Sequence, residues 1–554
     1  MIYWLLILLL IPAILITASF VKGRLTAKKT LAEIREQWGQ PKYIHRKFKL
    51  IAAYLTAFGG EYAASATDLD LDDVFAYIDR ASSKPGQQYL FKKLHSPEIS
   101  ENSFTTLEQL AEKFTEDTEL RELTEFKLSA LNKDDAYYLP ELFNTTHQSL
   151  FPSFVEFYIR IAAFLFVSLV IGVVIAPNPV YWMLLFTCVI ANFIIHYSNK
   201  TKMLRYTNSL PQLLKLYSVS KWLLDNGLLE QSDRVKKSLA NMAKLKKSLG
   251  YINVQNKVAA DPTDITLIVT EWIKILLMLE PLSFVISIAK VNKYPEDIRV
   301  LFDCVGEVDM AITVLSVREG LPYYCKPDFF SGNDQMVIKD LYHPLIENCV
   351  PNSISIDSRQ GVLVTGSNMS GKTTFIRTIA INALLSQTIN TSFAAEYKAP
   401  PLQILTSINM SDDLGGHTSY FQAEAQSIRD IIRHSAATKP LNSLVIIDEI
   451  FRGTNTIERI AAAKAVLSYF IENKNFVLVS THDLELAGLL GSDYKVFSFE
   501  ELSGDNRLTF DYKLKEGLLK NKNGIAVLKG LDYPQNIIDE AGRISVQLRE
   551  KYDL

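Results

Sequence analysis

The chain has 554 residues, which is enough for about three or four domains of ordinary size, each with its own core. Its formal net charge is −3, so the chain has no overall attraction to nucleic acid, and any such binding must be local. The four cysteines lie far apart, with no CxxC pair and no metal-ligand spacing. This pattern favours unpaired thiols in a reducing compartment.

The first apolar run covers residues 2–21 and carries no charged side chain. A helix of this length crosses the hydrocarbon core of a bilayer. A cleaved signal peptide is the alternative, but no basic segment precedes the run and no A-x-A site follows it. We expect an uncleaved N-terminal transmembrane helix, residues 1–22, followed by a linker, residues 23–66.

A second apolar stretch covers residues 161–197 and contains no Asp, Glu, Lys or Arg. The sequence PNP at 177–179 divides it into two halves, which predicts a transmembrane helical hairpin. A buried hairpin in a soluble core is the alternative. Basic residues follow the first run and the hairpin, whereas the N-terminus and the hairpin tip lack charged side chains. The positive-inside rule then predicts a cell (inner) membrane protein with three spans, with the N-terminus and the hairpin tip outside and the rest of the chain in the cytoplasm.

The remainder divides into a helical part and an α/β part. Residues 67–150 and 200–330 have apolar residues at helical spacing, and residues 265–289 read as a buried helix pair. From about residue 337, short apolar runs alternate with helical stretches, which predicts an α/β nucleotide-binding domain over 335–554. The runs expected to be strands are SISID, GVLVTG, SLVIIDEI, FVLVSTHD, YKVFSFEE and RLTFDYKL.

The segment TGSNMSGKTT, between an expected strand and an expected helix, fits the P-loop pattern G-x-x-x-x-G-K-[ST]. The two glycines allow backbone N–H groups to turn inward around a phosphate at the start of the helix. Lys372 is expected to reach the β- and γ-phosphates of ATP, and the Thr373 hydroxyl to bind Mg²⁺. The predicted phosphate-binding residues are Gly366, Ser367, Asn368, Met369, Ser370, Gly371, Lys372, Thr373 and Thr374.

Two further motifs supply candidate catalytic groups. The apolar run of SLVIIDEI ends in adjacent carboxylates, which is typical of a Walker B strand. Asp448 is expected to hold Mg²⁺, and Glu449 to polarise the attacking water as general base. In VLVSTHD, His482 follows another strand, where it can hydrogen-bond the γ-phosphate. A loop histidine without this role is the alternative. These residues together predict a Mg²⁺-dependent ATPase.

The motifs TGSNMSGKTT, SDDLGGHTSYFQAE, DEIFRGTNT and STHDLEL occur in the order and spacing of the MutS mismatch-repair ATPases. Residues 67–150 and 200–330 also resemble the helical core and lever domain of that family. The resemblance implies an ABC-type P-loop ATPase domain after an all-α core and lever domain, here interrupted by the hairpin. It also implies a homodimer with composite ATP sites, in which Ser419 approaches the γ-phosphate of the opposing subunit and FRGTNT lines the interface.

The sequence also departs from the family pattern. Phe451 stands where the family usually has glycine after the Walker B strand. Cys349 occupies the position of an aromatic residue that often stacks on adenine, and Tyr512 is the candidate for a second stacking residue. The family's mismatch-reading domain, with its Phe-x-Glu wedge, has no counterpart here. The sequence from Phe154 to Glu156 abuts the apolar hairpin and is expected to be helical.

The resemblance implies an ATP-switched clamp on DNA that is related to mismatch repair. A lysine-rich stretch, residues 233–257, could contact phosphates without reading sequence, although a solvated helix face or an anionic lipid contact would use the same charges. A transport motor is a second interpretation, but no LSGGQ-type signature precedes the Walker B strand. A nucleotide-gated protein that binds a membrane-protein client and no DNA is the third.

Overall fold

The computed structural model describes most of the chain. The described residues are 21–57, 65–97, 104–144, 150–198, 200–248, 271–329, 334–367, 369–408, 420–437, 442–504, 507–518 and 533–552. The first apolar run, the asparagine of the P-loop (Asn368) and Ser419 therefore lie outside these ranges. The chain divides into two compact units.

The first unit comprises residues 1–61, 79–93 and 105–317, and all its described elements are helical. Residues 21–36 and 271–276 are also helical. Its other helices are α2 (Phe48–Ile51), α3 (Ala53–Ala57), α5 (Lys84–His95), α6 (Thr105–Glu116), α7 (Thr118–Leu128), η1 (Ser129–Leu131), η2 (Asp134–Tyr138), α8 (Glu141–Asn144), α9 (Ser153–Ile175), α10 (Pro179–Tyr197), α11 (Lys200–Asp225), α12 (Asp233–Ser248), α15 (Leu279–Val291) and α16 (Pro295–Glu319).

A buried carboxylate joins α16 to the start of α5. Asp309 of α16 is fully buried and accepts hydrogen bonds from the backbone N–H groups of Ser82 and Ser83, at 2.9 and 2.8 Å, and from the Ser83 hydroxyl. These donors occupy the helix start, where N–H groups lack intrahelical partners. Gly86 lies so close that an added Cβ would be 2.1 Å from Asp309 Oδ2. Helix α5 therefore has a fixed position against α16.

Helices α9 and α10 form the hairpin, and both are long and apolar enough to cross a membrane by length and composition. Phe164, Val174 and Phe186 expose 79%, 76% and 67% of their surface. Helix α9 begins at Ser153, so Phe154 to Glu156 are helical, as expected. The Asn178 side chain accepts a hydrogen bond from the Val180 N–H at the start of α10, with Pro179 at the first helical position.

The hairpin is attached to the helical unit by a buried polar contact. The Tyr158 hydroxyl of α9 donates to Asn192 Oδ1 of α10 at 2.7 Å, and Asn192 Nδ2 donates to the Leu276 carbonyl at 2.9 Å. Helical structure stops just after Leu276, because Met278 takes a left-handed conformation with φ of 52° before α15 begins. Of the buried helix pair expected over 265–289, the described part, 271–289, contains two helical segments. Helix α15 is largely buried, whereas Trp272 and Ile273 of the first segment are exposed.

The second unit comprises residues 62–78, 94–104 and 318–554, and contains two sheets. Its strands are β1 (Asp328–Phe329), β2 (Gln335–Leu341), β3 (Asn352–Asp357), β4 (Gly361–Gly366), β5 (Glu396–Ala399), β6 (Leu402–Ser407), β7 (Asn442–Asp448), β8 (Phe476–Ser480), β9 (Tyr494–Gly504) and β10 (Arg507–Glu516). Its helices are α4 (Leu71–Ile78), α17 (Lys372–Ile389), α18 (Tyr420–Ala437), α19 (Thr456–Glu472), α20 (Glu485–Leu490), η3 (Gly491–Asp493) and α22 (Gln535–Tyr552).

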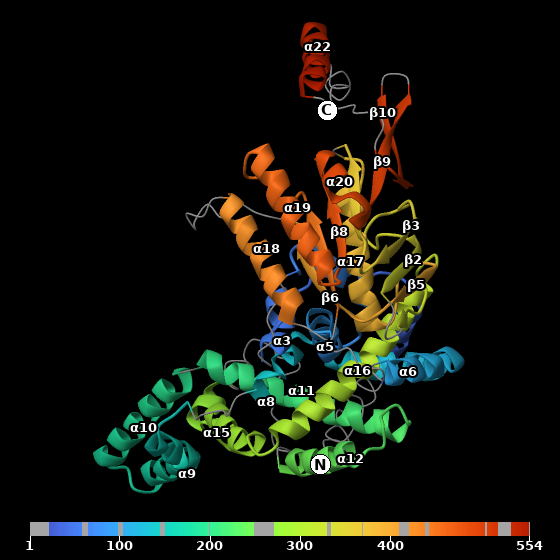
Figure 1. Ribbon diagram of the computed structural model, residues 1–554. Helices are drawn as coiled ribbons and strands as arrows, with labels where there is room; N and C mark the ends of the chain where they lie inside the picture. The colour runs from blue at the N-terminus through green and yellow to red at the C-terminus, as the bar shows by residue number, and fades with distance from the viewer. Residues whose placement is uncertain are drawn as a thin grey trace. The chain divides into compact units, whose positions relative to one another are not determined.

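The six-stranded sheet has the order β10-β9-β4-β8-β7-β6. It is parallel except for the pairing of β9 with β10, two strands that Figure 1 shows side by side. The smaller sheet has the order β1-β5-β2-β3. The six runs expected to be strands correspond to β3, β4, β7, β8, β9 and β10, so those predictions are confirmed. Strands β1, β2, β5 and β6 were not predicted.

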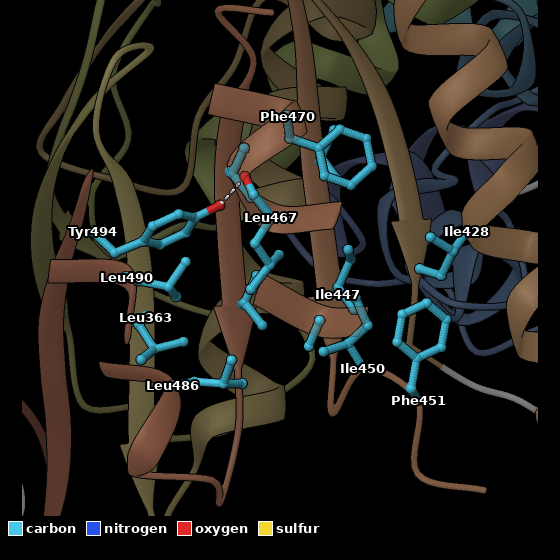
Figure 2. Close-up of a cluster of buried hydrophobic side chains, with 14 of the residues drawn as sticks. Leu363, Ile428, Ile447, Ile450, Phe451, Leu467, Phe470, Leu486, Leu490 and Tyr494 are labelled. Carbon is cyan, nitrogen blue, oxygen red and sulfur yellow. Dashed lines mark hydrogen bonds between the residues drawn. The ribbon is translucent and has the colours of Figure 1, made fainter. Parts of the chain in front are cut away.

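Neighbouring side chains of a strand point to opposite faces of the sheet. In the central strands both sets are apolar, and helices cover both faces. Leu363, Val445 and Val479 belong to a buried cluster that also includes Leu467 of α19 and Ile428 of α18 (Figure 2). Their neighbours in sequence face the other way, where α17 packs against β4, β6, β7 and β8. The near-continuous apolar strands follow from this double burial.

The contact between Gly86 and Asp309 gives a test of the helical unit. In Gly86→Ala, the new Cβ would displace the buried carboxylate from its three donors, so we expect the melting temperature to fall by about 5 °C, following a loss of about 2 kcal/mol. Gly488→Ala in α20 is the matched control, because nothing lies within 4 Å of its added Cβ. Thermal unfolding in detergent measures the melting temperature of both variants. Equal melting temperatures would contradict the close contact between Gly86 and Asp309.

Candidate functional site

The P-loop joins β4 to α17, and its backbone requires both glycines. Gly366 has φ of 147°, and a Cβ there would lie 2.9 Å from the Phe499 carbonyl oxygen. Gly371 has φ of 101° and immediately precedes α17. Met369 also has a positive φ, of 68°, and is 84% exposed. This succession of left-handed residues turns the loop around the start of α17, as phosphate binding requires.

Lys372 and Thr373 begin α17 inside this loop. Lys372 is 5% exposed, and its Nζ donates to the carbonyl oxygens of Gly366 and Ser367, at 2.9 and 2.8 Å. Burial lowers the pKa of Lys372, while the nearby carboxylates of Glu449 and Asp448 oppose that shift. The ammonium group thus lies within the loop, where a phosphate would offer it oxygen partners of greater negative charge.

The two predicted magnesium ligands are in direct contact. The Thr373 hydroxyl donates to Asp448 Oδ2 at 2.8 Å, and the Ser480 hydroxyl donates to Asp448 Oδ1. Asp448 ends β7, and Ser480 ends the neighbouring β8 in register with it. Mg²⁺ commonly takes one or two protein oxygens and completes its shell with phosphates and water. Two oxygen ligands beside a phosphate loop fit that requirement.

The side chain of Glu449 contacts two basic residues. Its Oε1 lies 2.9 Å from His482 Nε2, and its Oε2 pairs with the Arg452 guanidinium. Burial alone would raise the pKa of Glu449, but the hydrogen bonds and charges of His482 and Arg452 outweigh burial and hold it at about 2. His482 Nε2 also lies 3.4 Å from Lys372 Nζ. The structure therefore brings Lys372, Glu449 and His482 together.

A cavity of about 610 Å³ opens over the P-loop and is large enough for a nucleotide. Its lining includes Lys372, Thr373, Glu449 and Arg452 together with residues of a more apolar character. The more apolar lining residues include Leu341, Ile346, Cys349, Val350, Phe499 and Tyr512. The two residues discussed for adenine, Cys349 and Tyr512, thus line the same cavity as the P-loop.

Tyr512 is placed by hydrogen bonds between an asparagine side chain of one strand and the backbone of another. Asn352 of β3 donates from Nδ2 to the Tyr512 carbonyl at 2.9 Å and accepts from the Leu514 N–H at 2.8 Å. Tyr512 has φ of 52° and is 46% exposed, and a Cβ on Gly371 would lie 3.3 Å from its ring. The ring therefore lies beside the P-loop, with surface left for a base to contact.

Two serine side chains of the P-loop carry buried hydroxyls. Among the described residues, the hydroxyls of Ser367 and Ser370 are buried without a hydrogen-bond partner. A buried hydroxyl without a partner is costly. The described residues contain no group of three or more His, Cys, Asp or Glu that could hold a metal by themselves. A Mg²⁺ ion would therefore depend on the nucleotide for its remaining ligands.

The comparisons with known proteins concern this part of the chain. Residues 362–549 match the family model for MutS domain V. The chain is 32% identical over 286 residues to MutS protein homolog 4 of Mus musculus, covering 48% of this chain and 29% of the relative. It is 31% identical to DNA mismatch repair protein MutS of a Geobacillus species, covering 47% and 31%, and 33% identical to that of Listeria welshimeri, covering 49% and 32%.

This chain belongs to the MutS family. MutS domain V is the P-loop ATPase domain of the family, so the predicted P-loop ATPase domain is confirmed for residues 362–549. The alignments span less than a third of each of these relatives. The activity and the partners of these full-length relatives are therefore proposals for this chain.

Sequence reasoning did not identify several residues of the MutS ATPase site. Arg452 pairs with Glu449, and Arg459 holds Asp483 through two bonds, at 2.9 and 2.7 Å, directly after His482. Glu424 of α18 is buried and accepts from the Phe451 N–H. The segment FRGTNT is thereby tied to α18. Arg452, Glu424 and Asp483 are charged residues within the recognised motifs, so the sequence could have singled them out. Arg459 lies outside those motifs, and nothing in the sequence marked it.

Replacing Glu449 tests its role as the base. Glu449→Gln keeps the shape of the side chain and leaves Lys372, Thr373 and Asp448 intact, so nucleotide affinity should change little. Turnover should fall by about 100-fold or more, because the carboxylate that polarises water is lost. Fluorescent-nucleotide binding and phosphate release measure the two quantities. Glu472→Gln, on an exposed residue of α19, is the control, and an unchanged rate in Glu449→Gln would exclude the assigned role.

Proposed function

We propose that this chain is a membrane-anchored MutS-like ATPase that works as a dimeric clamp and hydrolyses ATP with Mg²⁺. The observation that carries the ATPase part is that Lys372, Thr373 and Glu449 line one cavity, with Asp448 bonded to Thr373 and His482 in contact with Glu449. Family membership supports the same activity.

In ATP hydrolysis, each of these residues would have its own role. Lys372 would bind the β- and γ-phosphates, while Thr373 and Asp448 would hold Mg²⁺ beside them. Bound Mg²⁺ would neutralise charge on the phosphate oxygens. Glu449 would orient the water that attacks the γ-phosphorus as the bond to the β-phosphate oxygen breaks. His482 would hydrogen-bond the γ-phosphate and so respond to its departure.

The dimer is supported by the resemblance and by local geometry. FRGTNT, residues 451–456, leaves the site after Glu449, and Arg452 is half-exposed beside the cavity. Ser419, which lies outside the described residues, would complete the opposing subunit's site. Composite sites of this kind couple ATP hydrolysis to the relative position of the two subunits. The dimer would therefore act as an ATP-driven switch.

Binding to DNA is supported by relatives named as DNA mismatch repair proteins and by one helix of this chain. Helix α12 buries Val235, Leu239, Met242 and Leu245 on one side. Its exposed side carries only basic charges beyond its first residue. These basic residues are Arg234, Lys236, Lys237, Lys244, Lys246 and Lys247. A phosphate backbone would be attracted to this face independently of its sequence.

Anchoring in the inner membrane is supported by the exposed apolar surface of α9 and α10. Large apolar side chains cover both helices, including Phe157, Ile171, Trp182 and Met183. Exposure on this scale is costly in water but suits lipid tails. Together with the N-terminal run, residues 2–21, the hairpin would give three spans and leave the ATPase domain in the cytoplasm.

A second candidate is a nucleotide-gated membrane protein that acts on a membrane-protein client, or with a transporter, and binds no DNA. The observation that favours it is the insertion of the apolar hairpin within the helical unit itself. ATP-driven movement of that unit would then be transmitted to partners in the bilayer.

The ATPase rate with and without DNA separates the two candidates. We expect duplex, mismatched, branched or single-stranded DNA to stimulate the solubilised protein, and higher salt to weaken the effect because phosphate contacts release counterions. Changing Lys236, Lys237 and Lys244 together to Gln should weaken the stimulation and reduce the salt dependence.

The matched control changes three exposed lysines of the ATPase domain, Lys464, Lys474 and Lys495, to Gln. Lys372→Ala should abolish the rate under every condition, which identifies the activity as that of this site. A rate that no DNA alters, while Lys372→Ala abolishes it, would favour the membrane-protein client.

Removing the first apolar run tests the hairpin independently. A chain without residues 1–22 should stay in the membrane pellet after alkaline carbonate extraction, because α9 and α10 would still span the bilayer. Replacing residues 161–197 in the same shortened chain with a short Gly/Ser linker should release it. Release of the shortened chain with the hairpin intact would show that the hairpin is not inserted.

A further inference from the structure

Helix α18 supplies a buried acceptor to the turn that follows Glu449. Glu424 of α18 is 3% exposed, and its Oε1 accepts a hydrogen bond from the Phe451 N–H. Glu449 and Phe451 both have left-handed backbones, with φ of 52° and 62°. This conformation is costly for residues that carry a side chain, so it persists where surrounding contacts hold it. The Glu424 carboxylate is one of these contacts.

The same turn also packs against α18. The Phe421 ring lies 6.0 Å from the Phe451 ring. A Cβ on Gly453 would lie 2.8 Å from that of Phe421, so the backbone of the turn passes close to the first turn of α18. Further along α18, Ile428 belongs to the same buried cluster as Phe451 (Figure 2). The helix is therefore a fixed support for this turn.

The residue that follows Phe451 reaches back to the proposed base. Arg452 pairs with Oε2 of Glu449, while His482 Nε2 lies 2.9 Å from Oε1. Each oxygen of Glu449 thus has a basic partner, and Arg452 is the partner that belongs to the turn. Arg452 also lines the nucleotide cavity. Its guanidinium can therefore orient Glu449 in the empty site and stabilise phosphate charge in the occupied site.

Charge also connects Arg452 to Glu424. Burial raises the pKa of Glu424, while the hydrogen bond from Phe451 and the positive charge of Arg452 oppose that shift. Arg452 therefore acts on two carboxylates, Glu424 of α18 and Glu449 after β7. Loss of Glu424 would remove the acceptor that fixes the backbone next to Arg452, and also a negative charge near its guanidinium.

We propose that Glu424 is a positioning residue for Arg452. By accepting from the Phe451 N–H, Glu424 fixes the turn from which the Arg452 side chain reaches Glu449 and the cavity. This inference rests on the proposed ATPase, in which Glu449 is the base. It gives α18 a role in the ATP site of its own subunit.

The first test compares two substitutions of Glu424 in the full-length protein. Glu424→Met keeps the length of the side chain but removes the acceptor, so kcat should fall about tenfold. The KM for ATP should stay within about threefold, because Lys372 and the P-loop are unchanged. Glu424→Gln keeps an acceptor oxygen and should hold kcat within about threefold of the parent value. Gln426→Met, at an exposed position of α18, is the matched control and should keep the parent kcat.

Three results of this comparison would overturn the proposal. A parent kcat in Glu424→Met would show that the turn holds without Glu424. An equal loss of kcat in Glu424→Gln would show that the acceptor oxygen is not what the turn requires. A loss that lies entirely in KM would place the effect of Glu424 on nucleotide binding instead of on the catalytic step.

The decisive test is a double-mutant cycle with Arg452. Because Glu424 acts through Arg452, Glu424→Met should lower kcat no further once Arg452→Ala has been made. The double variant should therefore lie within about twofold of Arg452→Ala alone. If the two residues act independently, two tenfold losses multiply to about 100-fold. A multiplied loss would overturn the proposal, and so would a parent kcat in Arg452→Ala.

Lys372→Ala distinguishes failure of this inference from failure of the proposed function. If the parent hydrolyses ATP and Lys372→Ala abolishes hydrolysis, a multiplied loss in the cycle overturns only the role of Glu424. If the parent shows no hydrolysis that depends on Lys372, the proposed ATPase and this inference are both overturned. Should Glu424→Met not fold, Glu424→Asp withdraws the carboxylate by one methylene, and the same cycle applies to it.

Discussion

The register of three parallel strands is the constraint on which the site depends. Val364 of β4 pairs with Ser480 of β8, and Ser480 pairs with Asp448 of β7. The backbone extends this alignment past the strands, because the Thr481 N–H donates to the Val364 carbonyl and the Glu449 N–H donates to the Ser480 carbonyl. The P-loop, both carboxylates and His482 therefore leave the sheet at one edge. A shift in this register would separate them all.

The departure at Phe451 can be understood from its backbone. Phe451 has φ of 62°, a conformation that glycine adopts freely and that costs another residue about 1–2 kcal/mol. The side chain offsets this cost because it is 6% exposed and its ring lies 6.0 Å from that of Phe421. Burying a phenylalanine stabilises by about 2–3 kcal/mol. The chain can thus keep the turn that glycine would favour while anchoring the loop in the core.

Local sequence patterns predicted the buried strands and the site residues that directly follow them. Strands β4, β7 and β8 are nearly all apolar, and the motifs at their ends identified Lys372, Asp448 and Glu449. Strand β6 was missed because LQILTS mixes polar with apolar residues and follows two prolines. The contact of Asp68 with Thr406 and Ile408 joins residues far apart in the chain, and no periodicity in either segment encodes such a pairing. Arg452 was visible in FRGTNT, but its pairing with Glu449 was not.

Charge balance explains how the pocket keeps Glu449 ionised and how ATP would change this carboxylate. Arg452 and His482 both contact Glu449, and Lys372 Nζ lies 3.4 Å from His482 Nε2. With the pKa of Glu449 at about 2, its carboxylate is a weak proton acceptor. Nucleotide phosphates would compete for the same cations, and any contact that draws Arg452 or His482 away raises the pKa of Glu449. Substrate binding would thereby make Glu449 a stronger base at the moment when a γ-phosphate is present.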